Sequence, residues 1–267
     1  MQLVDVHCHL NHILFKDDLK QVLERAQKIG LKAILVSGVN PQDNKEVLEL
    51  TKKHEILKAS LGIYPIDALG LAEPNPGLPE QKGPINLEEQ FKFIEDNKED
   101  IVAIGEIGMD FKEATKENTY NQQSENFRKI IQFAKKINKP IVIHSRKAEA
   151  ECLEILQQEL PMNKIAVNLH CFSGKKKLVK KAVELGYYFS IPPNCVKAQQ
   201  FQMIIELTPI TQLLTETDSP WPSHNNERNE PSNVIESIKV IAKIKNISVE
   251  EASNHIWDNY LQFLGEK

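Results

Sequence analysis

The chain has 267 residues, of which 41% are hydrophobic and 26% are charged, and its formal net charge is -4. The mixed charges exclude a strongly basic coat that binds nucleic acid without specificity, although they allow a basic patch at a cleft. With no apolar run long enough to cross a bilayer and no signal peptide, we expect a cytoplasmic protein with a single domain over residues 1–267.

Apolar strands and amphipathic helices alternate along the whole chain. The first strand lies within residues 2–9, and further strands are predicted at 33–39, 59–65, 101–109, 140–144, 165–170, 187–191 and 212–217. Helices are predicted at 16–30, 43–54, from 86 onward, 120–138, 148–160, 175–186, 231–245 and 249–263. Eight strands separated by helices predict an α/β fold, a (β/α)8 TIM barrel.

Residues 69–84 interrupt this alternation with four prolines and three glycines. Such a composition excludes a continuous helix or strand. We therefore expect a long loop on the carboxyl side of the third strand, serving as a lid or forming a disordered insertion.

Five predicted strands end in residues that commonly bind metal ions. In the first strand Asp5, His7 and His9 share one face, because side chains two residues apart point the same way. The carboxyl ends of barrel strands converge at one mouth, so these residues should form one site. Each alone has an ordinary structural explanation, but five coincident strand ends favour a metal site. The predicted ligands are His7, His9, Glu106, His144, His170 and Asp218.

Four imidazoles and two carboxylates are too many ligands for one ion that must also keep a position open for water. Two ions that share one carboxylate can accept all six. We therefore predict two divalent ions, with Glu106 as the bridge. The predicted catalytic residues are Glu106 and Asp218, with Asp218 taking a proton from the attacking water. The identity of the ions stays open among Mg²⁺, Mn²⁺ and Zn²⁺.

Several neighbours of these strand ends are candidates for substrate contacts. Arg146 should share a face with His144, where it would bind phosphate or form a structural salt bridge. Residues 172–175 open a helix whose free N–H groups would hold an anion. The candidate substrate-binding residues are Arg146, Ser173, Tyr64 and Trp221, with His224 as a further candidate, and Asp5 and Asp110 are expected to orient the ligands.

Six segments carry a family resemblance: residues 5–9 (DVHCH), 105–110 (GEIGMD), 144–146 (HSR), 170–174 (HCFSG), 216–220 (ETDSP) and 228–231 (RNEP). In this order they resemble the motifs of the TatD family of metal-dependent hydrolases and deoxyribonucleases, over nearly the whole chain. The resemblance implies an amidohydrolase-type barrel, a one- or two-ion site, and cleavage of phosphodiesters, often from a DNA 3′ end. It also implies that His7, His9 and Asp218 hold one ion, that His144 and His170 hold the other, and that Glu106 joins them.

The chain departs from the family pattern at Tyr64, where members usually have a histidine. We expect a 3′ to 5′ exonuclease that acts on DNA ends, prefers single strands and is a monomer. The alternative is an ester or amide hydrolase, such as an aminoacyl-tRNA deacylase or a small-molecule amidohydrolase, because the same ions polarise a carbonyl. A barrel that only binds is disfavoured, since six clustered ligands destabilise a fold that holds no ion.

Overall fold

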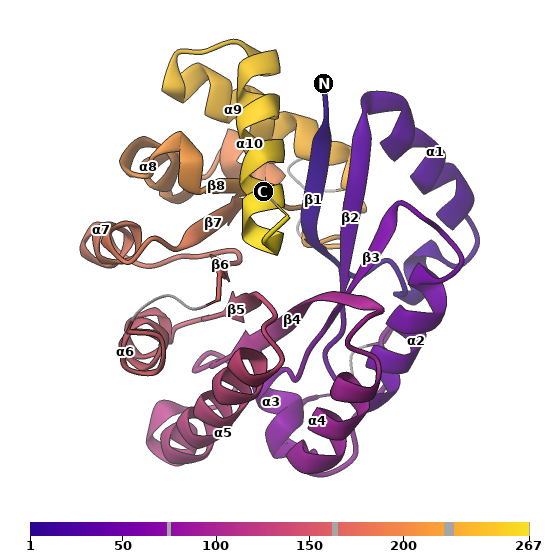
Figure 1. Cartoon of the computed structure of the whole chain (residues 1–267), viewed down its shortest axis with the longest axis vertical. Helices are drawn as coiled ribbons and strands as arrows, with labels where there is room; N and C mark the ends of the chain where they lie inside the picture. Colours follow the sequence, from indigo (N-terminus) through magenta and orange to yellow (C-terminus); the bar gives the residue numbers. More distant parts are fainter. Residues whose placement is uncertain (74–75, 162–164, 222–226, 267) are drawn as a thin grey trace.

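The computed structural model describes residues 1–73, 76–161, 165–221 and 227–266. Its strands form one eight-stranded sheet in which every neighbouring pair from β1 to β8 is parallel and follows chain order. Helices surround this sheet, which confirms the predicted (β/α)8 barrel (Figure 1). The strands are β1 (Leu3–Cys8), β2 (Leu31–Ser37), β3 (Leu57–Leu61), β4 (Ile101–Gly108), β5 (Ile141–His144), β6 (Val167–Leu169), β7 (Tyr188–Ile191) and β8 (Leu213–Thr215).

Each strand is followed by at least one helix, and every α-helix buries apolar residues in the core. Within the described chain, no helix combines the length and the apolar character needed to cross a membrane. The α-helices are α1 (Leu19–Ile29), α2 (Pro41–Thr51), α3 (Pro65–Leu69), α4 (Leu87–Asp96), α5 (Lys116–Lys136), α6 (Glu149–Glu159), α7 (Lys176–Glu184), α8 (Gln199–Leu207), α9 (Val234–Lys245) and α10 (Val249–Leu264), and the short 3-10 helices are η1 (Ile13–Phe15), η2 (Pro193–Val196), η3 (Ile210–Gln212) and η4 (Pro231–Asn233).

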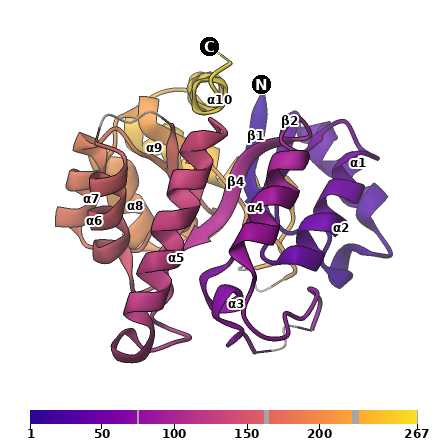
Figure 2. The same ribbon diagram turned by 60° about the horizontal axis from the view of Figure 1, so that its bottom comes forward.

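The two ends of the barrel differ in what covers them. Figure 2 shows α10 beside both chain termini at one end and α3 at the opposite end. The last helix is tied to the start of β1, where the Ser253 hydroxyl donates to the carbonyl oxygen of Gln2 at 2.8 Å. The carboxyl ends of the strands therefore open toward α3 and the loops beside it.

Side chains and a few backbone bonds join β8 to β1, and no strand ladder between these two is present in the described residues. The Thr215 hydroxyl donates to a backbone oxygen of β1 at 2.7 Å. Asp5 accepts hydrogen bonds from the backbone N–H and the hydroxyl of Thr217, at 3.0 and 2.5 Å. The Asp218 N–H donates to the carbonyl oxygen of His7 at 2.8 Å. This seam sets the end of β8 directly beside the end of β1.

Two elements differ from the sequence-based prediction. The third strand ends at Leu61, because the next N–H, that of Gly62, donates to the Asn44 side chain and not to a neighbouring strand. Pro65 takes the first position of α3. Helix α8 was not predicted, although Phe201, Ile204 and Ile205 are buried at helical spacing. After α3, the described residues up to Pro84 form the predicted loop.

Candidate metal centre

Four imidazoles converge on the carboxylate of Glu106, which β4 buries to 6% exposure. Its Oε2 lies 3.3 Å from His144 Nδ1, 3.3 Å from His170 Nε2 and 3.8 Å from His7 Nε2. Its Oε1 lies 4.0 Å from His9 Nε2. The ends of β1, β4, β5 and β6 therefore deliver five ligand-type side chains to one point.

Asp218 completes this group from the end of β8. Its Oδ1 lies 3.5 Å from His7 Nε2 and 3.6 Å from His9 Nε2, so two carboxylates flank the pair of histidines on β1. The structure thus brings together all six residues that the sequence predicted as ligands. Among these six residues, three groups have ligand atoms within 4.8 Å of one another: His7, His9 and Glu106; His7, His170 and Asp218; and Glu106, His144 and His170.

The His7 side chain suits a divalent ion better than it suits the protein alone. Its Nε2 is buried and has no hydrogen-bond partner in the described structure, while its Nδ1 lies 3.0 Å from the Ser37 hydroxyl. Burial and the neighbouring His170 hold the pKa of His7 well below its usual value, so the ring is neutral. A buried nitrogen without a partner is costly, and a metal ion facing its lone pair removes that cost.

Glu106 and His144 carry opposite charges in the cluster, the first negative and the second positive. Burial alone would raise the pKa of Glu106, but hydrogen bonds from His144 and His170 hold it well below its usual range. Burial alone would lower the pKa of His144, but Asp110 and Glu106 raise it to about 9. A divalent ion that enters the cluster must therefore displace protons.

Asp110 and Asp5 support the ligands in different ways. Asp110 Oδ2 lies 2.8 Å from His144 Nε2, the ring nitrogen that faces away from Glu106. Asp5 accepts the backbone N–H of His7 at 3.2 Å and ties the same strand to Thr217. Asp110 therefore contacts a ligand ring, whereas Asp5 holds the backbone that carries the ligands.

Sequence reasoning missed two further contacts to the ligand rings. Glu216 is fully buried, and its Oε2 lies 3.2 Å from His170 Nδ1. The same oxygen accepts a hydrogen bond from the Ser190 hydroxyl at 2.6 Å, and Oε1 accepts one from the Cys171 N–H at 2.8 Å. Ser37, the last residue of β2, contacts His7. Both positions carried a signal, because each places a polar side chain at the end of an apolar strand.

A cavity of about 740 Å³ lies over the cluster. It is lined by Tyr64, Arg146 and Trp221 and by the loop that follows α3. Arg146 stands at the rim with 55% of its side chain exposed, and its Nη1 lies 3.7 Å from Glu113. This size falls within the range of pockets that hold small ligands.

Ser173 does not reach this cavity, contrary to its predicted substrate contact. Its exposed hydroxyl donates to Glu149 Oε1 at 2.7 Å, because the start of α7 turns it toward α6. The candidate His224 lies outside the described residues.

The wall of the cavity is acidic around the ligand cluster. Asp67, Glu73, Glu80 and Glu113 line it, and Arg146 is the one lysine or arginine among the lining residues that the structure describes. A long polyanion would therefore gain little from this wall beyond what bound ions supply.

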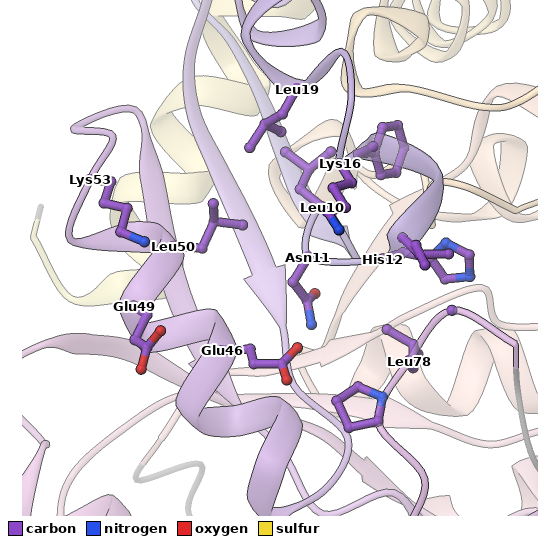
Figure 3. A pocket seen from close by; sticks show the side chains of 14 residues that line it. Leu10, Asn11, His12, Lys16, Leu19, Glu46, Glu49, Leu50, Lys53 and Leu78 are labelled. Carbon is purple, nitrogen blue, oxygen red and sulfur yellow. The ribbon is translucent and has the colours of Figure 1, made fainter.

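A second cavity of about 550 Å³, shown in Figure 3, lies behind the loop. Leu78 and Pro79 line both cavities. This part of the loop is anchored where Asn40 Nδ2 donates to the Pro79 oxygen at 2.8 Å and the Ile13 N–H donates to the Gly77 oxygen at 3.0 Å. The loop thus forms a partition between the two cavities. The far wall of the second cavity comes from the segment between β1 and the start of α1 and from α2 with the residues just after it, including Leu10, Lys16, Leu19, Glu46, Glu49, Leu50 and Lys53.

Comparison with known families and sequences gives consistent results. The family model described as TatD related DNase matches residues 4–265. The chain is 33% identical to Deoxyribonuclease TATDN3 of Homo sapiens, over 97% of this chain and 93% of that protein. It is 34% identical to the uncharacterized metal-dependent hydrolase MJ1582 of Methanocaldococcus jannaschii, over 97% of this chain and 96% of that protein.

Solved structures share the same fold. A hydrolase TatD family protein from Entamoeba histolytica superposes with a TM-score of 0.83 at 23% identity, covering 100% of this chain and 99% of that one. YJJV, a TATD homolog from Escherichia coli k12, gives a TM-score of 0.83 at 24% identity, covering 98% of this chain and 97% of that one. These likenesses support the barrel architecture.

Proposed function

Because the chain belongs to the TatD-related DNase family of metal-dependent hydrolases, we propose that it is a deoxyribonuclease that removes nucleotides from DNA 3′ ends. The observation that carries this proposal is the convergence of four imidazoles on Glu106, with Asp218 beside them. Imidazole and carboxylate together suit divalent transition metals.

In the proposed site, His7, His9 and Asp218 hold one ion, His144 and His170 hold a second, and Glu106 contacts both. Two such ions would lower the pKa of a water and neutralise phosphate oxygens. Support for this division comes from two groups that each include Glu106, one with His7 and His9 and the other with His144 and His170. Mn²⁺ is the ion that we would test first, with Mg²⁺ and Zn²⁺ beside it.

Asp218 is the proposed general base. Its Oδ1 lies at the edge of the cluster and its side chain is 20% exposed, so water reaches it from the cavity. It would take the proton of the water that attacks phosphorus, while the P–O3′ bond breaks. The proton would pass to the leaving 3′-oxygen, which gives a shortened strand with a 3′-hydroxyl and a free nucleoside 5′-monophosphate. Arg146 at the rim would hold a phosphate oxygen, and Trp221 would stack on a base.

Single-stranded ends are the proposed substrate, because the cavity over the cluster, lined in part by the loop after α3, has a volume of about 740 Å³, which suits a single nucleotide better than a duplex. An unpaired terminal nucleotide enters such a cavity without the energy needed to open a base pair. With Arg146 as the one described lining cation, the slope of log affinity against log salt should be shallower than about -1. The predicted single domain, monomeric state and cytoplasmic location belong to the same proposal.

A second candidate is favoured by the acidic lining. The carboxylates of Glu73, Glu80 and Glu113 would attract the ammonium group of an aminoacyl ester, which the same ions would hydrolyse at its carbonyl. This keeps aminoacyl-tRNA deacylation and small-molecule amide hydrolysis as the alternative class.

One experiment separates the two candidates. The Mn²⁺-loaded protein is assayed on 3′- and 5′-labelled single-stranded and blunt duplex DNA, and on a panel of aminoacyl esters and cyclic amides. We expect stepwise shortening of the single strand from its 3′ end, with Glu106→Gln as the inactive control. Hydrolysis of the ester or amide panel with untouched DNA at matched metal concentration would replace the first candidate with the second.

A further inference from the structure

Asp110 is an unusually well-held carboxylate beside the ligand cluster. Its Oδ1 accepts the backbone N–H groups of Lys112 and Glu113 at 2.7 and 2.9 Å. Its Oδ2 lies 2.8 Å from His144 Nε2 and also accepts the Tyr64 hydroxyl at 3.1 Å. The carboxyl group is buried, and each hydrogen bond that it accepts restricts the rotation of the Asp110 carboxylate that orients His144.

The Tyr64 side chain reaches this carboxylate from a backbone that is held by two hydrogen bonds. The Tyr64 N–H donates to the Val39 carbonyl oxygen at 2.8 Å, and the Tyr64 carbonyl oxygen accepts the Ala68 N–H at 2.8 Å in the first turn of α3. The tyrosine ring lies against the imidazole of His144, with centroids 5.0 Å apart and an interplanar angle of 75°. Tyr64 therefore restrains His144 directly through its ring and indirectly through Asp110.

We infer that Tyr64 is a positioning residue for the ion held by His144 and His170, acting through Asp110, and that it is not a surface for base stacking. The inference rests on the two-ion site proposed above. The two contacts hold the His144 ring so that Nδ1 points at Glu106, 3.3 Å away, where the second ion is proposed to bind. Loss of the hydroxyl removes one of the two donors to Asp110 Oδ2 and leaves the packing of the ring intact.

Positioning and stacking predict different results for two substitutions. A stacking role depends on the ring, so Tyr64→Phe would change nothing and Tyr64→Leu would raise KM for DNA. A positioning role depends on the hydroxyl, so Tyr64→Phe alone would weaken the binding of the second ion. Contacts that orient a metal ligand typically change affinity by about 10 to 100-fold when removed, and a single phenol should lie near the lower figure.

The test measures metal retention by the full-length protein. Mn²⁺-loaded wild type, Tyr64→Phe, Tyr64→Leu and His144→Ala are dialysed against decreasing free Mn²⁺, and ions per chain are counted by elemental analysis. Tyr187→Phe is the matched control, because the Tyr187 hydroxyl has no hydrogen-bond partner in the described structure. We expect Tyr64→Phe to lose one ion at about tenfold higher free Mn²⁺, with the other ion and Tyr187→Phe unchanged.

Two further readouts identify the ion and the cause. In the background of His144→Ala, Tyr64→Phe should have no additional effect on metal retention, because both changes act on the same ion. With DNA as substrate, Tyr64→Phe should lower kcat at limiting Mn²⁺, regain it at excess Mn²⁺, and leave KM within about twofold.

Each alternative result overturns the inference. Unchanged retention in Tyr64→Phe would remove the role of the hydroxyl, and a raised KM confined to Tyr64→Leu would restore the stacking role. Equally weakened binding of both ions in Tyr64→Phe would indicate a general destabilisation of the fold and would contradict a role at one ion. A wild-type protein that binds a single ion would overturn both this inference and the two-ion site. Because retention is measured without substrate, failure of the proposed DNA cleavage would not be mistaken for any of these results.

Discussion

Glu216 Oε2 lies 3.2 Å from Nδ1 of His170, while Nε2 of the same ring lies 3.3 Å from Glu106. The buried carboxylate thus holds a proton on Nδ1 and leaves Nε2 free for an ion. Since the hydroxyl of Ser190 and the N–H of Cys171 also donate to Glu216, its orientation is fixed.

Replacing Glu216 with glutamine should weaken metal binding by about 10 to 100-fold, because the amide holds the imidazole proton less strongly. Metal retention during dialysis measures this change. The exposed Glu250→Gln in the first turn of α10 is the control and should retain metal normally. Full retention in Glu216→Gln would show that its contact with His170 is only structural.

Glu106→Ala should reduce activity more than either His144→Ala or His170→Ala. The carboxylate lies within 4.0 Å of all four imidazoles, whereas each histidine substitution removes only one of these rings. Loss of one strong electrostatic contact in a transition state commonly costs about 2.7 to 4 kcal/mol, and Glu106→Ala should reach at least that value. The comparison uses kcat/KM at saturating Mn²⁺, and near-normal turnover with metal still bound would contradict the bridging role.

Metal binding should release protons near neutral pH. The pKa of His144 is raised to about 9, since its contacts with Asp110 and Glu106 outweigh burial, and the pKa values of His170 and His9 are also raised. These rings hold protons below their raised pKa values, so protons compete with the ion. Metal affinity should therefore increase as pH rises toward 9. Calorimetric titration with Mn²⁺ in two buffers of different ionisation enthalpy counts the protons, and zero release at pH 7 would contradict this picture.

Asp67→Asn should stabilise the fold at alkaline pH. Burial raises the pKa of Asp67 to about 6, against the hydrogen bond from Asn40 that lowers it. The folded state thus binds the Asp67 proton more tightly than the unfolded state does. The stability that this proton contributes is therefore complete below about pH 4 and is lost as pH rises through 6. We expect a gain of about 1 to 2 kcal/mol at pH 8 that shrinks at pH 4.5.

Urea unfolding at the two pH values measures this gain. The exposed Asp17→Asn is the matched control and should show no such pH-dependent difference. Equal effects of Asp67→Asn at both pH values would mean that packing, and not the buried charge, governs this position.

The barrel and the six ligand-type residues were predictable because apolar runs mark parallel strands and the polar residue that ends each run faces the mouth. Side-chain directions in the loops that follow the strand ends were harder to predict. Cys171 has a positive φ angle of 44°, so the alternation of a strand no longer applies there. The same limit explains Ser173, whose direction depends on the loop before α7.

The partners of the ligand rings were harder to predict than the ligands. The position of Glu216 at the end of an apolar strand marks it as a candidate, but only the fold shows it buried against His170. Tyr64 is an aromatic residue near the mouth, and only its distance to Asp110 reveals that its hydroxyl is engaged. Such roles depend on contacts between segments far apart in the chain, which local patterns do not encode.

The seam between β8 and β1 also has a consequence during synthesis. Asp5 and Thr217, which join these strands, are 212 residues apart in the sequence. A nascent chain on the ribosome therefore carries His7 and His9 long before Asp218 emerges to join them. A complete site should form only after the final strand and Asp218 have been translated, so metal capture would report their arrival beside β1, and fragments that end before Asp218 would not acquire the hydrolytic centre.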